Sequence, residues 1–106
     1  MSIGIWTAVA GTTKLTTFGN PLLTALADRT RSLVVTAGPH LRFVNLGCAP
    51  VFLVPSPVPT TDGDALTRGI PVAAESDVVL AAAPGTYTLY SPYESLSLLT
   101  TEGTLT

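Results

Sequence analysis

The sequence has 106 residues, of which 46% are hydrophobic and only 11% are charged, and its formal net charge at pH 7 is −2. This length holds one domain, the few basic residues exclude nucleic-acid binding driven by electrostatics, and the apolar stretches are far shorter than the roughly 20 residues of a membrane-spanning helix. Because a typical soluble domain carries about 25% charged residues, we expect part of the apolar surface to be buried against another copy or another protein.

The first thirty residues differ in pattern from the rest of the chain. Apolar residues around Trp6 predict an extended stretch over residues 3–9, for which residues 14–18 are a possible partner. The alternative is that residues 1–18 form a free arm that binds a neighbouring subunit. We therefore expect deletion of residues 1–18 to impair assembly more than it harms the fold of the remaining chain.

A short helix is predicted after this stretch. Asn20 has the chemistry of a helix N-cap, and Pro21 is preorganised for the first helical position. The leucine-rich residues that follow predict about two helical turns before Asp28.

From residue 31 onward the chain predicts short strands and tight turns, because β-branched residues and leucine fill the intervals between Gly and Pro. The strands are placed at residues 32–36, 41–45, 51–54, 78–82, 86–91 and 96–101. Asn45-Leu46-Gly47 has turn chemistry and predicts a hairpin between the second and third of these strands. The proline-rich residues 55–59 leave the sheet, residues 60–69 form an exposed loop, and residues 70–72 return to the core.

Strands at about ten-residue spacing, separated by turn signals, predict an all-β fold. We expect an antiparallel β-sandwich or a jelly-roll-like barrel of about seven or eight short strands, with an extended N-terminal arm and one short helix. Residues 1–30 are predicted to be the arm or a docked segment, and residues 31–106 are predicted to be the β-sandwich domain.

Residues that carry catalysis or bind metals are scarce. His40 and Cys48, the only histidine and cysteine, flank a predicted strand, which places them farther apart than the roughly 3 Å that a nucleophile and its base require. Asp62-Gly63-Asp64 lacks the order and the later ligands of a calcium loop, which favours a solvated turn. Glu75 and Asp77 lie two residues apart at the start of a predicted strand, which favours two hydrated surface side chains over a catalytic carboxylate pair. The sequence therefore predicts no catalytic residue, no metal site, no cofactor and no enzymatic activity.

The aromatic residues supply the interface candidates. Trp6 lies near a terminus, where a free tail gains nothing from a tryptophan, so we expect it to dock on its own chain or on a neighbouring subunit. Tyr90 and Tyr93 bracket Ser91-Pro92, and at least one of them is predicted to be exposed and to anchor an interface, with packing in the turn as the alternative. Phe18 is the remaining interface candidate.

Turn and packing residues follow one another in a recognisable order along residues 32–104. The order begins with a strand, an Asn-aliphatic-Gly turn, a strand with an aromatic residue, a polar loop and a Pro-Val element. It continues with a short apolar strand, a Gly turn, a Tyr-bearing strand and a Gly-terminated strand. The residues in these places are Asn45, Gly47, Phe52, Pro71, Val72, Gly85, Tyr87 and Gly103. This order resembles the small β-sandwich virion proteins encoded near the capsid genes of tailed bacteriophages.

The resemblance implies a capsid decoration or cement protein, located in the virion, that binds the outside of a phage head and stabilises the shell. The partners that it implies are the major capsid protein or other virion proteins, together with further copies of the chain, with a trimer favoured. It implies neither nucleic acid nor a membrane as a partner. The alternatives are another virion component, such as a neck, tail or head-fibre subunit, and a cellular β-sandwich binding module.

Overall fold

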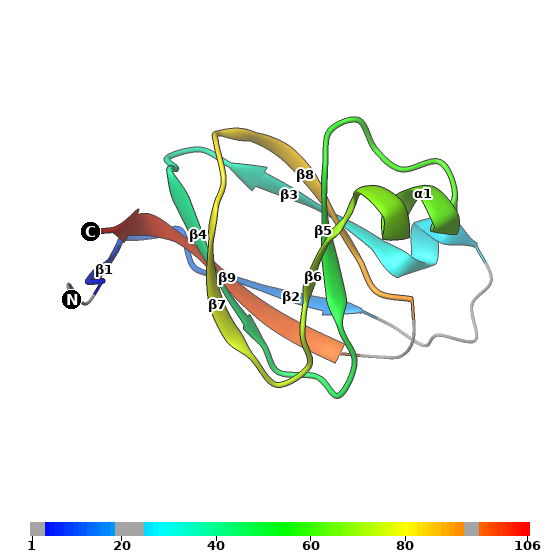
Figure 1. Ribbon diagram of the computed structural model, residues 1–106, viewed down its shortest axis with the longest axis horizontal. Helices are drawn as coiled ribbons and strands as arrows, with labels where there is room; N and C mark the ends of the chain where they lie inside the picture. The colour runs from blue at the N-terminus through cyan, green and yellow to red at the C-terminus, as the bar shows by residue number, and fades with distance from the viewer. Residues whose placement is uncertain (1–3, 19–24, 93–95) are drawn as a thin grey trace.

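The computed structural model describes residues 4–18, 25–92 and 96–106 (Figure 1). Its strands are β1 (Trp6–Ala8), β2 (Lys14–Phe18), β3 (Thr30–Val35), β4 (His40–Asn45), β5 (Val51–Pro55), β6 (Ile70–Val72), β7 (Asp77–Ala81), β8 (Gly85–Tyr90) and β9 (Leu96–Leu105). A 3-10 helix, η1 (Leu26–Arg29), precedes β3, and an α-helix, α1 (Asp62–Arg68), precedes β6. The helix predicted from Asn20-Pro21 begins outside the described residues, and only its end overlaps η1.

The strands form two antiparallel sheets that enclose the core. Sheet A has the order β1-β9-β4-β7, with β2 also paired to β9, and sheet B has the order β3-β8-β5-β6. In Figure 1 β1 and the end of β9 lie at one end of the molecule, and α1 lies at the other. The antiparallel β-sandwich expected from the sequence is confirmed.

The order of pairing identifies the sandwich as a jelly roll. The strands pair as nested partners: β2 with β9, β3 with β8, β4 with β7, and β5 with β6. Two further pairings join these nested pairs into two sheets: β4 pairs with β9 in sheet A, and β5 pairs with β8 in sheet B. Such nesting is what two interlocked Greek keys produce.

The turn after β4 crosses from one sheet to the other, so the predicted hairpin between residues 41–45 and 51–54 is wrong. β4 pairs with β7 and β9, whereas β5 pairs with β6 and β8. Asn45 holds this crossover: its side-chain amide donates to the carbonyls of Ala49 at 2.9 Å and Val72 at 3.3 Å, and its oxygen accepts from the N–H of Gly47 at 2.9 Å. The side chain thus replaces hydrogen bonds that a tight hairpin would have supplied.

The N-terminal residues belong to sheet A, which agrees with the docked alternative. β1 and β2 do not pair with each other, as residues 3–9 and 14–18 were expected to, but lie end to end along β9. Between them Gly11 takes φ +81°, and the Thr12 hydroxyl accepts from the N–H of Glu102 at 3.1 Å. Because β2 is a full sheet partner and its Phe18 is buried in the core, deleting residues 1–18 would damage the fold, and the predicted division at residue 30 does not separate two units.

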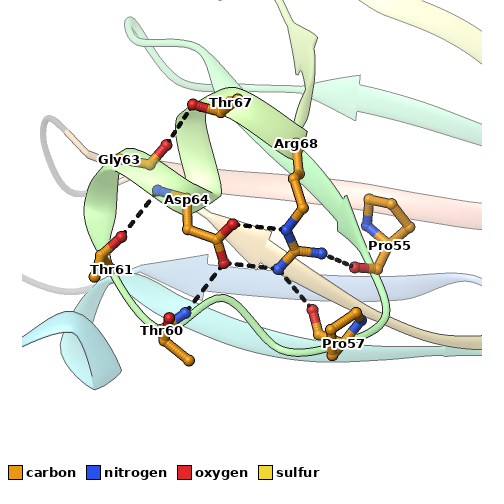
Figure 2. Close-up of polar contacts among 8 residues, drawn as sticks. All are labelled: Pro55, Pro57, Thr60, Thr61, Gly63, Asp64, Thr67 and Arg68. Atoms are coloured by element: carbon orange, nitrogen blue, oxygen red, sulfur yellow. Dashed lines mark hydrogen bonds and ion pairs between the residues drawn. The ribbon is translucent and has the colours of Figure 1, made fainter.

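Residues 60–69 contain the helix α1 rather than the predicted exposed loop. The Thr61 hydroxyl accepts from the N–H of Asp64 at 3.0 Å, and the Asp64 carboxylate accepts from the N–H of Thr60 at 3.3 Å (Figure 2). This arrangement is a variant of the capping box, and its Thr-x-x-Asp spacing is a helix signal that the sequence contains.

Arg68 fastens α1 to the proline-rich segment. Its guanidinium binds the Asp64 carboxylate through contacts of 2.8 and 2.9 Å and donates to the carbonyls of Pro55 and Pro57 at 2.9 and 2.8 Å (Figure 2). The inner side of the helix contributes Ala65, which is fully buried. One ion pair, two carbonyl contacts and one buried methyl group therefore help to position this short helix at the end of sheet B.

Thr100 of β9 carries the one buried side-chain oxygen that lacks a hydrogen-bond partner among the described residues. Because an unpaired buried polar group costs about 1–3 kcal/mol, Thr100→Val is expected to raise the free energy of unfolding by about 1 kcal/mol in urea denaturation. The control is Thr12→Val, which removes a hydroxyl bonded to the backbone of Val9 and Glu102 and should lower the free energy of unfolding. A Thr100→Val variant less stable than the wild type would contradict this reading of the core.

Candidate assembly surface

The basic side chains are all engaged within the chain. Arg29 binds Asp62, Arg42 binds Asp77 and Arg68 binds Asp64. The other two basic residues, Lys14 and Arg31, connect β2 with β3. Lys14 Nζ donates to the carbonyl of Val34 at 3.1 Å, and Arg31 Nε donates to the carbonyl of Thr17 at 3.2 Å. Each cation of the chain therefore has an intramolecular contact.

A second polar cluster, around Asp62 at the start of α1, also holds this helix in place. Both oxygens of the Asp62 carboxylate lie 2.7 Å from Arg29 Nη2, and Oδ1 also accepts from the Tyr90 hydroxyl at 2.8 Å. The hydrogen bonds from Arg29 and then Tyr90 hold the pKa of Asp62 below its usual range. Burial, with the hydrogen bond to Asp62, raises the pKa of Tyr90 to about 12. An ionised carboxylate and a neutral phenol form a stable structural clamp, and neither is available as a proton donor or acceptor near neutral pH.

Two of the predicted interface residues are used inside the chain. Tyr90 is buried beneath α1, and its ring lies 6.2 Å from that of Phe52. Phe18 is buried at the edge of the core, where the Arg31 guanidinium lies 5.1 Å from the centre of its ring. Both rings have their contacts within the chain, so the expectation that they face a partner is corrected. Tyr93 lies outside the described residues.

Trp6 is half-buried on β1 and packs over β9. A Cβ atom at position 103 would lie 2.7 Å from the indole ring, so the absence of a side chain at Gly103 allows the ring to approach β9 closely. The docking of Trp6 on its own chain, one of the two expected alternatives, is therefore observed.

An apolar row crosses the outer face of sheet A. Leu15 of β2 lies opposite Leu99 of β9, and Leu99 lies opposite Val44 of β4. Leu15 is 63% exposed, and the other two side chains are partly buried. Leu46, just after β4, extends the apolar surface and is also exposed. We call Leu15, Val44, Leu46 and Leu99 the sheet A patch.

A shallow pocket of about 290 Å³ adjoins this patch. Its lining combines Val44 and Leu46 of the patch with Asn45, Glu75, Ser76 and Asp77. The Asp77 carboxylate is paired with Arg42, which holds the pKa of Asp77 below its usual range. Apolar residues beside a partly neutralised acidic rim suit a protein loop more than a small charged ligand.

His40 and Cys48 do not form a nucleophile–base pair. His40 begins β4, where its Nδ1 accepts from the N–H of Leu105 at 3.2 Å, and Cys48 is exposed beyond the opposite end of that strand. In the described part of the chain, no three His, Cys, Asp or Glu residues gather to hold a metal ion. None of the described helices is long and apolar enough to cross a membrane.

Comparisons with protein-family models, with curated proteins and with solved structures found no match to this chain.

The residues of the sheet A patch were not among the predicted interface residues. Leu15 had a usable signal, because it alternates with Phe18 along Lys14–Phe18 and so faces the opposite side of the strand. Val44 and Leu99 had no local signal, since their place beside Leu15 depends on pairing between distant strands.

Proposed function

We propose that this chain is a structural virion protein that decorates the outside of a tailed-phage head and cements the shell. The observation that carries the proposal is the sheet A patch, an apolar row on the outer face of a sheet, with Leu15 63% exposed and the nearby Arg42 and Asp77 paired with each other. Permanent assemblies bury such apolar surface, whereas a free monomer has to keep it in water. The low charge of the whole chain supports the same reading.

The strand order adds support by analogy. Jelly rolls occur in viral capsid proteins and in lectins, so the fold is compatible with a virion role without specifying it. A lectin site would require aromatic and polar side chains around a sugar-sized pocket. The pocket beside the sheet A patch has no aromatic residue in its lining, which favours a protein surface as the ligand.

Binding to phage heads tests the proposal directly. Expanded tailed-phage heads stripped of their accessory proteins are mixed with the purified chain and sedimented. Saturable binding at hundreds of copies per head supports decoration of the lattice. Binding of about a dozen copies, or no binding, would overturn decoration of the head and move the search to the neck, the tail or a cellular ligand.

A charged substitution in the sheet A patch gives the matched test. Leu15→Asp should weaken head binding about tenfold or more, because burying a leucine contributes about 1.5–3 kcal/mol and a buried unpaired carboxylate is costly. Val58→Asp is the control, since Val58 is also 63% exposed but lies in the loop before α1. Equal binding by the two variants would show that the patch does not contact the shell.

A further inference from the structure

The end of sheet A formed by the chain termini is a two-stranded ribbon with an open edge. Ile5 and Thr106 exchange backbone hydrogen bonds of 2.8 and 3.0 Å, and the N–H of Val9 donates to Glu102 at 2.8 Å. In an antiparallel ladder such residues alternate with residues whose backbone groups point away from the partner. Trp6 and Ala8 therefore direct their N–H and C=O groups outward, and no described residue binds those groups.

Other sheet edges carry features that discourage further pairing. At the corner between β2 and β3, Lys14 and Arg31 each donate to a carbonyl of the opposite strand. β6 carries Pro71, and β7 begins at Asp77. Prolines and charges of this kind block strand addition. The β1 edge has no such feature, because residues 1–13 contain no charged side chain.

We propose that β1 pairs with β1 of a second copy of this chain in an antiparallel dimer whose two-fold axis passes beside Thr7. In this register Trp6 and Ala8 of one copy form the hydrogen-bonded pair with Ala8 and Trp6 of the other. The same register places Ile5, which is 65% exposed, opposite the exposed Val9 of the second copy. The edge is thus complementary to itself in hydrogen bonds, apolar contacts and lack of charge, as a two-fold interface requires.

The dimer joins two copies of sheet A, which has five strands, into one continuous sheet. The two-fold axis of an antiparallel strand pair is perpendicular to the sheet, so both sheet A patches would face the same side. The inference nevertheless stands apart from the proposed binding to phage heads, because it is tested on the isolated protein. Its failure would leave the decoration role open, and failure of that role would leave the dimer intact.

Sedimentation equilibrium and four variants test the dimer. The wild type should sediment at twice the chain mass of 10.9 kDa. Ala8→Pro removes an outward N–H while sparing the ladder to β9, and should be monomeric, whereas the control Ala8→Thr keeps the N–H and should remain dimeric. Thr7→Lys and Thr7→Glu place like charges opposite each other at the axis and should each raise the dimer dissociation constant at least about tenfold.

Mixing supplies the decisive result. An equal mixture of Thr7→Lys and Thr7→Glu should recover the dimer, because opposite charges then face each other across the axis. A monomeric or trimeric wild type, a dimer that survives in a folded Ala8→Pro variant, or a mixture that fails to recover the dimer would overturn the proposal. Should Ala8→Pro not fold, as judged by circular dichroism, the Thr7 pair decides the outcome alone.

Discussion

Asn45→Asp is expected to lower the free energy of unfolding by about 3–5 kcal/mol at pH 7. Asn45 is 2% exposed, and its amide donates to two backbone carbonyls of the crossover between β4 and β5. Aspartate has nearly the same shape but presents a carboxylate to those carbonyls, so two acceptors lose their donor and a charge is buried. The loss should be measured by urea denaturation monitored through Trp6 fluorescence or far-ultraviolet circular dichroism.

The pH dependence of the unfolding free energy of the Asn45→Asp variant distinguishes the effect of the buried charge from the effect of side-chain shape. Protonation of the new carboxyl removes the charge and restores one donor, so the deficit relative to the wild type should narrow as the pH falls toward about 4. A deficit that does not change with pH would show that steric fit, and not the amide donors, holds the crossover.

Glu102→Gln is the second substitution with a large expected effect on the free energy of unfolding, and it acts at the turn between β3 and β4. Glu102 is 2% exposed, and one carboxylate oxygen accepts from the backbone N–H groups of Thr36, at 2.7 Å, and of Ala37. Burial opposes the charge, but the hydrogen bonds from Ala37 and then Thr36 outweigh it and hold the pKa of Glu102 below its usual value. Replacing these charge-assisted bonds with neutral ones should cost about 1–3 kcal/mol at pH 7.

The direction of the pH effect follows from the lowered pKa. The unfolded chain binds a proton at Glu102 near pH 4.5, whereas the folded chain resists protonation to a lower pH. The carboxylate therefore contributes stability that is fully present above pH 4.5 and is lost as the pH falls through the folded pKa. The wild type and Glu102→Gln should converge in stability in that acid range. Parallel stability curves at all pH values would contradict the assignment.

Local pattern predicted the strands well. Residues 32–36, 41–45 and 51–54 coincide within two residues with β3, β4 and β5, because β-branched residues between turn residues favour extended backbone wherever they stand. The helix α1 was missed although Thr61 and Asp64 have capping-box spacing, since Asp62-Gly63-Asp64 also has the composition of a turn. Whether such a segment folds as a helix or as a turn depends on whether Ala65 can pack into the core.

By itself, then, the sequence determined the fold class, the strand positions and the shortage of charge that predicts an apolar interface. Only the tertiary structure decided that the turn at Asn45 crosses between sheets, that β1 and β2 both lie on β9, and that Phe18 and Tyr90 face inward while Leu15 faces outward. The physical reason is that strand pairing joins residues as distant as Trp6 and Leu105. Their register depends on how both sheets close over one core, and no local pattern records it.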